Sequence, residues 1–463
     1  MLTSKLDKHI TIIGAGLVGS LMSIYLGQRG YKVTVYEKLP DIRKESIPAG
    51  RSINLALANR GIRPLQQVGI MDKVKNLLIP MKGRMLHDID GKLQFQSYGQ
   101  KPEEVIYSVS RSGLVSLLRD EAEATGNVTF HFKHKLIDVD FDENQLTVNN
   151  WINDTTEQHN FDILLATDGA GSKVRRIRED RDMGDFSAEL LEHHYKELTI
   201  PAGENGNYLI EKEALHIWPR GGYMLIALPN LEGDFTVTLF MPKDNSKHNE
   251  ISFEQLTTHE SVNNFFQTQF NDAYQLIPNL SQMFFDNPTG ILGTVRSKQW
   301  HYKDTLLFGD AAHAVVPFHG QGMNCGFEDC AELNALLNKF DDDWQQVMPA
   351  FTEARRDNAN AIADMALENY IEMRDSVRDP KFHLKKAISF ELEKKFPLQF
   401  IPRYSMVMFH HIPYAEAKSR GLLQANILQQ LSDGIESTEQ LDWQLANNLV
   451  EQQLSTLSRE YLQ

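Results

Sequence analysis

The feature that most constrains the fold is a glycine-rich segment near the start of the chain, Gly14-Ala15-Gly16-Leu17-Val18-Gly19. An apolar strand precedes it at residues 9–13, an apolar helix follows to about Gly30, and KVTVYE at residues 32–37 has the pattern of a second strand. In such a unit the first glycine makes the tight turn, the second lets the backbone approach a pyrophosphate, and the third packs helix against strand. The segment therefore predicts a Rossmann-like unit that binds a dinucleotide.

The acid at the end of the second strand narrows the choice of dinucleotide. Glu37 is placed to bond a ribose hydroxyl, and its charge would repel a 2′-phosphate. We therefore expect FAD or NAD at this site and not NADP. The alternative is a glycine-rich turn in an ordinary α/β unit that binds nothing.

Two later segments repeat the order of buried strand, acid and glycine. In FDILLATDGAGSKVR the strand at residues 163–166 leads into Asp168-Gly169, and LLF at residues 306–308 leads through Gly309 to Asp310. Strand ends that converge in this way suit one extended ligand, which favours FAD over NAD. A dehydrogenase would instead use its remaining length for a substrate domain with a catalytic His or Tyr.

A helix is predicted to follow the last of these segments. Pro317, Gly320 and Gly322 precede apolar positions that recur at helical spacing from about Gln321. The positive end of that helix would favour the negative charge that a reduced flavin carries. A strand, loop and helix whose glycines only permit close packing is the alternative.

Composition limits the classes of partner. A chain of 463 residues suggests two or three domains, and its net charge of -15 argues against general binding to nucleic acid or to an anionic membrane. Cys325 and Cys330 would point in different directions from one helix, so we expect no disulfide and a reducing compartment. Neither a signal peptide nor a run long enough to cross a membrane is evident, so we expect a soluble, cytoplasmic protein, and a homodimer remains open.

The three motifs, in this order, resemble those of the single-component flavoprotein aromatic hydroxylases. Within that family the chain is similar to the branch that hydroxylates kynurenine, and the similarity runs from about Ile10 to about Ala415. The blocks that carry it are GRSINLAL (residues 50–57), KGRMLH (82–87), ALHIWP (214–219), VVPFHGQGMNC (315–325), MALENYIEM (365–373) and FIPRYSMV (400–407). The segment after about residue 415 has no such anchor.

The resemblance implies an α/β fold in which a mixed β-sheet substrate domain is inserted into a Rossmann-like FAD-binding domain. We expect the FAD-binding domain at residues 1–182 and 299–353, the substrate domain at 183–298, and a helical region at 354–463. Within the substrate domain, residues 222–242 have the pattern of a hairpin. Met224, Ile226 and Leu228 share a face of its first strand, and Thr236, Thr238 and Phe240 share a face of its second.

The C-terminal region shows amphipathic helical patterns at residues 362–373, 383–395 and 424–461. Animal members of the family carry a membrane segment at the C-terminus. This chain ends STLSREYLQ, so membrane anchoring is not carried over.

The resemblance also implies the residues of the sites. The expected cofactor-binding residues are Gly14, Gly16, Leu17, Gly19, Glu37, Ala56, Arg111, Leu136, Asp168, Asp310, Pro317, Gly322, Met323 and Asn324. The expected substrate-binding residues are Arg84, Tyr98, Asn369 and Tyr404 at the amino-acid end, with Met224, Ile226, Phe240, Phe318 and His319 as pocket lining. Without the resemblance, Arg111 and Asn369 would be taken as surface residues and the tyrosines as packing.

The implied reaction is hydroxylation of L-kynurenine at C3 to 3-hydroxykynurenine, with non-covalent FAD, NADPH and O2, through a flavin C4a-hydroperoxide. This step belongs to tryptophan degradation and leads toward NAD biosynthesis. The flavin performs the chemistry, so no side chain is assigned as catalytic, and no metal site is expected. With no second GxGxxG, the NADPH surface is not identified.

Several other functions remain open. They are an FAD-dependent hydroxylase of another small aromatic substrate, a NAD-dependent dehydrogenase, and a flavin-binding protein without activity. A flavin halogenase is disfavoured because the sequence contains no WxWxIP segment.

Overall fold

The central element of the computed structural model, which describes residues 8–45, 54–244, 251–374 and 379–462, is a six-stranded sheet in the order β18-β19-β12-β1-β2-β8. Neighbouring strands are parallel except for β18 and β19. The strands are β1 (His9–Ile13), β2 (Lys32–Glu37), β8 (Val128–Phe132), β12 (Ile163–Ala166), β18 (His301–Tyr302) and β19 (Thr305–Leu307). Because β1, β2, β12 and β19 are parallel, their carboxyl ends meet at one edge of the sheet, as the sequence predicted for Glu37, Asp168 and Asp310.

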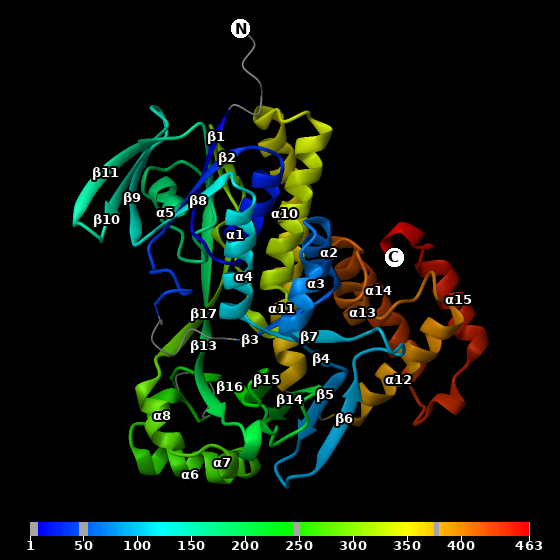
Figure 1. Ribbon diagram of the computed structural model, residues 1–463. Helices are drawn as coiled ribbons and strands as arrows, with labels where there is room; N and C mark the ends of the chain where they lie inside the picture. The colour runs from blue at the N-terminus through cyan, green and yellow to red at the C-terminus, as the bar shows by residue number, and fades with distance from the viewer. Residues whose placement is uncertain (1–7, 46–53, 245–250, 375–378, 463) are drawn as a thin grey trace.

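Helices pack on the faces of this sheet (Figure 1). α1 (Leu17–Gln28) contacts α4 (Arg111–Ala124) on one side and α10 (Gly322–Lys339) on the other. Ten of the residues of α1 are buried, which explains why its sequence is apolar on all sides instead of amphipathic. The predicted order of strand, GxGxxG, helix, strand and acid is confirmed. The predicted helix after Gln321 is α10.

A seven-stranded sheet, in the order β17-β13-β16-β15-β14-β5-β6, forms the second layer of the molecule. Its strands are β5 (Gly83–His87), β6 (Leu93–Ser97), β13 (Phe186–Ile200), β14 (Ala214–Pro219), β15 (Met224–Pro229), β16 (Phe235–Pro242) and β17 (Thr289–Ser297). One face packs against α6 (His259–Gln269), α7 (Asn271–Leu276) and α8 (Leu280–Asp286), which lie below it in Figure 1.

The predicted hairpin is confirmed as β15 and β16. Met224 pairs with Phe240 and Ile226 pairs with Thr238 across the two strands. Directly opposed residues point to the same side of a sheet, so the two predicted sets share one face. This face, which lies opposite the helices α6 to α8, includes Arg84 on β5.

Two smaller sheets and several helices complete the fold. The sheets are β11-β10-β9 and β3-β7-β4. Their strands are β3 (Asn54–Leu57), β4 (Leu78–Met81), β7 (Ile106–Ser110), β9 (His134–Asp140), β10 (Gln145–Asn150) and β11 (Thr155–Asn160). The remaining helices are α2 (Asn59–Gln67), α3 (Met71–Val74), α5 (Lys173–Asp180), α9 (Asp310–His313), α11 (Trp344–Arg374), α12 (Pro380–Lys395), α13 (Arg403–Met408), α14 (Tyr414–Ser432) and α15 (Trp443–Gln453).

Several elements of the structure cross the domain boundaries that were expected from the sequence. β5 and β6 lie within residues 1–182 but belong to the seven-stranded sheet, in which β5 pairs with β14 and β6 pairs with β5. The expected boundary at residues 353 and 354 falls inside α11, which is continuous from Trp344 to Arg374. The amphipathic pattern at residues 424–461 is broken between α14 and α15, where Gly434 has a φ of 77°. The division into domains therefore remains an approximate proposal.

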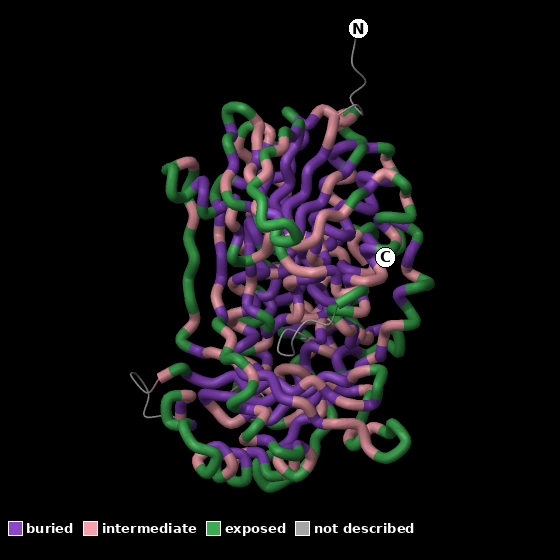
Figure 2. Tube along the Cα trace, turned by 60° about the vertical axis from the view of Figure 1, so that its left-hand side comes forward, coloured by how far each residue is buried: buried purple, intermediate pink, exposed green. Residues whose placement is uncertain are grey.

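Burial follows the two layers. Figure 2 shows buried segments through the interior and exposed segments around the rim. The largest apolar cluster surrounds the six-stranded sheet, and a second joins the seven-stranded sheet to α6, α7 and α8. Cys325 and Cys330 are both buried and free. Within the described residues, no helix is long and apolar enough to span a bilayer. Residues 50–53 of the GRSINLAL block lie outside the described residues.

Candidate active site

A cavity of about 990 Å³ opens at the carboxyl edge of the six-stranded sheet, and we call it the cofactor cleft. Its wall combines strand ends, the glycine-rich turn and the start of α4. The expected cofactor-binding residues that line it are Gly14, Gly16, Glu37, Arg111, Leu136 and Asp168. Residues that lie far apart in the sequence thus meet around one cavity.

Each glycine of the GxGxxG segment has a separate structural reason. Gly14 has a φ of 101°, and a Cβ there would lie 2.6 Å from the Thr167 carbonyl oxygen. A Cβ at Gly19 would lie 2.1 Å from the Gly14 carbonyl oxygen, so this glycine permits the helix to pack against the turn. Gly16 has no atom within 4 Å of an added Cβ, and its backbone faces the cleft. An approaching pyrophosphate would meet this open backbone.

Glu37 joins the glycine-rich turn to the cleft. Its Oε2 accepts a hydrogen bond of 2.8 Å from the Ala15 N–H, and its Oε1 accepts one of 2.9 Å from the Leu39 N–H. Each carboxylate oxygen can accept a further hydrogen bond. The side chain can therefore hold the turn and still accept from a ribose hydroxyl.

The two other acids at the sheet edge, Asp168 and Asp310, each have a carboxyl group whose pKa is raised. Asp168 Oδ2 accepts a hydrogen bond from the Lys173 N–H, whereas its buried Oδ1 has no partner within the described residues. Burial raises the pKa of the Asp168 carboxyl. The Asp310 side chain is accessible to water, yet surrounding protein desolvates it enough to raise the pKa of its carboxyl, against the opposing charges of His313 and Arg111. Both acids are suited to accept hydrogen bonds from a polyhydroxyl ligand.

The other expected cofactor-binding residues lie outside the lining of the cofactor cleft. They are Leu17, Gly19, Ala56, Asp310, Pro317, Gly322, Met323 and Asn324. Asn324 links two of the segments involved, since its Nδ2 donates to the carbonyl oxygens of Ala56 and Gly320 at 2.8 Å each. Its Oδ1 accepts from the Ala58 N–H. Asn324 thereby fixes the N-terminal turn of α10 to β3.

The cleft is also lined by cations that the sequence analysis did not single out. Lys38, Lys135, Lys173 and Arg176 line it. In a chain with a net charge of -15 they provide the local positive potential that a pyrophosphate requires. Lys173 and Arg176 lie a short distance after Asp168-Gly169 in the sequence, and this proximity was the available signal. FAD fits the open backbone at Gly16, the acids at the strand ends and these cations.

A second site lies on the face of the seven-stranded sheet opposite α6 to α8. We define the Arg84 cluster as Arg84, Tyr98, His319 and Tyr404. The rings of Tyr98 and Tyr404 stack with centroids 5.3 Å apart, and His319 stacks on Tyr404 at 5.5 Å. The Arg84 guanidinium lies 5.8 Å from the Tyr98 ring and 5.1 Å from the Tyr404 ring. Four distant segments thus meet around one buried cation.

The Arg84 cluster is buried but incompletely hydrogen-bonded. Arg84 is 6% exposed, and its Nη1 lies 3.4 Å from Glu372 Oε1. Burial acts to lower the pKa of Arg84, but Tyr404, Glu372 and Tyr98 outweigh it, so the guanidinium is charged. Arg84 Nε and the Tyr98 hydroxyl have no hydrogen bond of good geometry to any described residue. Burial also raises the pKa of Tyr98 to about 12, so its hydroxyl remains a donor. The cluster presents unused donors to an anion.

An aromatic group adjoins the Arg84 cluster. Phe318 packs edge-on against Phe240 at 5.0 Å, and both belong to an apolar cluster with Met224. Ile226 is packed against the same cluster. Asn369 Nδ2 donates to the Phe318 carbonyl oxygen at 2.6 Å, which sets the position of the turn carrying Phe318 and His319. All nine expected substrate-binding residues are therefore brought to one region.

The His319 ring is neutral. Burial, followed by the nearby arginines, lowers the pKa of His319 to about 3. Its Nδ1 is buried and has no partner among the described residues. The ring can therefore pack against a ligand without adding charge.

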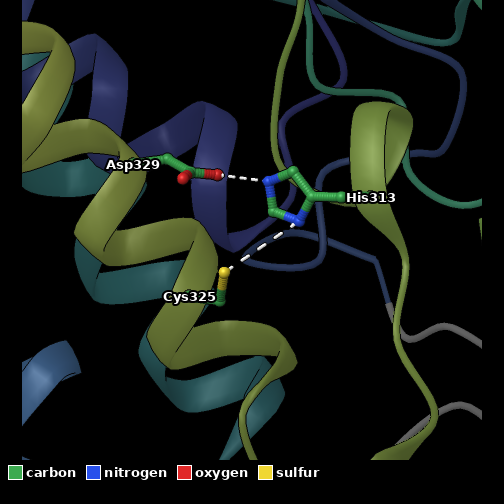
Figure 3. Close-up of side chains that lie close together, drawn as sticks. All are labelled: His313, Cys325 and Asp329. Carbon is green, nitrogen blue, oxygen red and sulfur yellow. Dashed lines mark hydrogen bonds and ion pairs between the residues drawn. The ribbon is translucent and has the colours of Figure 1, made fainter. Parts of the chain in front are cut away.

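His313, the last residue of α9, belongs to a buried ion network that sequence analysis missed (Figure 3). His313 Nε2 and Asp329 Oδ2 are 2.6 Å apart, and Cys325 Sγ lies 4.0 Å from His313 Nδ1. Arg355 Nε donates to Asp329 Oδ1 at 2.6 Å. Although His, Cys and Asp are metal-binding residue types, Asp329 is already shared between two cations. Asp329 raises the pKa of His313 well above 6.5 despite burial, so we interpret the group as an ion network.

Comparison with known proteins identifies a family. A family model described as an FAD binding domain matches residues 7–366. The chain is 46% identical over 453 residues to a kynurenine 3-monooxygenase of Myxococcus xanthus, covering 98% of this chain and 97% of that protein. It is 44% identical over 452 residues to a kynurenine 3-monooxygenase of Stenotrophomonas maltophilia, covering 97% and 98%.

Solved structures show the same fold. P. aeruginosa PqsL in complex with 2-aminobenzoylacetate is similar with a TM-score of 0.64 and 19% identity, over 80% of this chain and 98% of that one. A 2-methyl-3-hydroxypyridine-5-carboxylic acid oxygenase variant is similar with a TM-score of 0.65 and 18% identity, over 84% and 98%. At these identities the similarity is evidence for the fold alone, and it agrees with the expected α/β architecture.

Proposed function

This chain belongs to the kynurenine 3-monooxygenase family, and on that basis we propose that it hydroxylates L-kynurenine at C3 with FAD, NADPH and O2. The family membership confirms the resemblance drawn from the motifs. The observation that most supports the substrate is the Arg84 cluster, a buried cation with unused donors beside an apolar aromatic group. L-Kynurenine has a carboxylate that could pair with the cation and a benzene ring that could pack against the aromatic group.

The cofactor cleft provides what FAD needs. Gly14 and Gly16 would receive the pyrophosphate, Glu37 the ribose hydroxyls, and Arg111 with the lining lysines the phosphate charge. Asp310 would accept from hydroxyls on the ribityl side. When bound, FAD accepts a hydride and activates dioxygen for transfer of one oxygen atom to an aromatic carbon.

The substrate residues would act by position and by excluding water. The Arg84 guanidinium would pair with the substrate carboxylate, and the Tyr98 and Tyr404 hydroxyls would donate to its remaining lone pairs. Phe240, Phe318, Met224 and Ile226 would enclose the ring. The substrate's aniline nitrogen already activates the neighbouring carbon, so the protein need not supply a strong acid or base.

The experiment is a steady-state assay on the purified yellow holoenzyme. We expect L-kynurenine to stimulate NADPH oxidation and to be converted to a product with one additional oxygen. Stimulation by another small aromatic compound, with no response to L-kynurenine, would favour the alternative hydroxylase. The absence of flavin absorbance in the purified protein would contradict the FAD assignment. The cytoplasmic location remains a prediction from the sequence, and a homodimer remains open.

A further inference from the structure

The residue opposite Arg84 is a buried glutamine with an unused acceptor. β5 and β6 are antiparallel, and Arg84 pairs directly with Gln96. Direct partners share a face and hold their Cβ atoms roughly 5 Å apart. Gln96 is 7% exposed, and its Oε1 has no hydrogen-bond partner within the described residues. A buried amide oxygen without a partner is unfavourable unless a ligand supplies the donor.

The unused groups around this position have complementary chemistry. Arg84 Nε and the Tyr98 hydroxyl are donors, whereas Gln96 Oε1 is an acceptor, and all three atoms are buried. The donors suit a carboxylate and the acceptor suits an ammonium group. An α-amino acid carries both groups on one carbon. The pair Arg84 and Gln96 can therefore receive both charges of a zwitterion from neighbouring strands.

Helix α12, in the C-terminal region, contacts the Gln96 side chain. Gln96 Nε2 lies 3.4 Å from His383 Nδ1, so the amide nitrogen is directed toward α12. Two further contacts fix this helix to the segment that follows Gln96. Lys386 Nζ donates to the Ser97 carbonyl oxygen at 3.0 Å, and Gln100 Nε2 donates to Glu393 Oε2 at 2.6 Å. With its nitrogen occupied by α12, the Gln96 amide leaves its oxygen for a ligand.

We propose that Gln96 is a specificity-determining residue whose Oε1 accepts a hydrogen bond from the α-ammonium group of the substrate while Arg84 holds the carboxylate. This inference rests on the proposed function and adds to it a reason for selecting an amino acid over the corresponding keto acid without the α-amino group. It also gives α12 a role, since His383 orients the Gln96 amide. Glu372 is the nearby acid, and its Oε1 lies 3.4 Å from Arg84 Nη1.

The test is a flavin absorbance titration of the holoenzyme with two ligands. L-Kynurenine carries the α-ammonium group, and 4-(2-aminophenyl)-4-oxobutanoate lacks it. We expect Gln96→Met to weaken L-kynurenine binding by roughly 10-fold to 100-fold, because a hydrogen bond to a charged group is lost. Binding of the deamino ligand should change by less than about twofold, which is within the usual context dependence of such a contact.

Matched variants separate this role from packing. Gln94→Met lies on the same strand, but Gln94 is exposed, so it should leave both ligands unaffected. Gln96→Glu keeps the shape and strengthens the acceptor, so L-kynurenine should bind at least as tightly while the deamino ligand binds more weakly. His383→Ala should give part of the Gln96→Met effect on L-kynurenine alone. FAD content should equal that of the wild type in each variant.

The outcomes distinguish the inference from the proposed function. Equal weakening of both ligands by Gln96→Met would show that Gln96 only supports packing against α12, and unchanged binding of L-kynurenine would place its ammonium group elsewhere. Either result overturns the inference and leaves the proposed function intact. If Gln96→Met does not fold, unchanged discrimination in Gln96→Glu overturns the inference. Failure of the wild-type holoenzyme to bind L-kynurenine would instead contradict the proposed function.

Discussion

Replacing Arg84 by alanine tests how the substrate's carboxylate is held. Arg84 is 6% exposed, so its guanidinium would meet a carboxylate where water cannot screen the pair. Loss of one partner of a desolvated charge pair costs about 2 to 5 kcal/mol. The dissociation constant of L-kynurenine should therefore rise by roughly a hundredfold or more. Arg84→Lys should recover only part of this loss, because an ammonium group cannot reproduce the two parallel hydrogen bonds of a guanidinium.

The assay is titration of the holoenzyme with L-kynurenine, followed by flavin absorbance. Lys82→Ala is the matched control, because Lys82 lies two residues away but is exposed and paired with Glu213. FAD content should be unchanged in both variants, since neither residue lines the cofactor cleft. A decarboxylated analogue should bind the wild type poorly and should respond little to Arg84→Ala.

Wild-type affinity for L-kynurenine in Arg84→Ala would refute this reasoning. The carboxylate would then be held by other groups, and the assignment of the Arg84 cluster to the amino-acid end would be wrong. Equal losses in Arg84→Ala and Lys82→Ala would point to a general effect on β5 and its flanking turn.

Three further predictions concern the cofactor and the ion network. Glu37→Arg should weaken FAD binding by removing the ribose acceptor and the support of the glycine-rich turn, and full FAD retention through dialysis would contradict this. Asp310→Ala should yield largely apo protein with a lower melting temperature, because FAD stabilises the folded state by mass action. If added FAD does not change the melting temperature of the wild type, this prediction is refuted. His313→Asn should destabilise the protein by about 3 kcal/mol at low pH. The pKa of His313 is raised in the folded state, so its stabilising effect is complete below the ordinary value of 6.5 and is lost as pH rises through the folded value. The difference in melting temperature between wild type and variant should therefore shrink at alkaline pH, and a constant difference would argue for packing alone.

Local signals in the sequence were sufficient for the first part of the fold. The segment from β1 through the GxGxxG turn and α1 to Glu37 shows strand and helix periodicity, glycines at fixed positions and an acid at the end of β2. All of these signals lie within one short segment, so its local structure is determined by residues close together in the sequence. The same holds for β12 before Asp168 and for β19 before Asp310. Because parallel strands align their carboxyl ends, convergence of these acids also followed from the pattern.

The Arg84 cluster could not be found from local pattern alone. Its members come from β5, the turn after β6, the turn before α10, and α13, and only tertiary packing brings them together. The family resemblance supplied them, but it supplied neither Gln96 nor the His313 network. Gln96 is identified as a site residue only by its pairing with Arg84 across β5 and β6. The register of such a pair depends on packing against other parts of the chain, which the local sequence does not show. The pairing of β5 with β14, and of β6 with β5, was not predicted for the same reason.

The most direct test of the proposed function is the origin of the oxygen atom in the product. The purified holoenzyme would be incubated with NADPH, L-kynurenine and dioxygen enriched in the heavy isotope, in ordinary water, and the product would be analysed by mass spectrometry. The proposed function predicts 3-hydroxykynurenine carrying one heavy oxygen atom, formed in proportion to the NADPH consumed. Consumption of NADPH with unmodified L-kynurenine, or a product whose added oxygen comes from water, would contradict it.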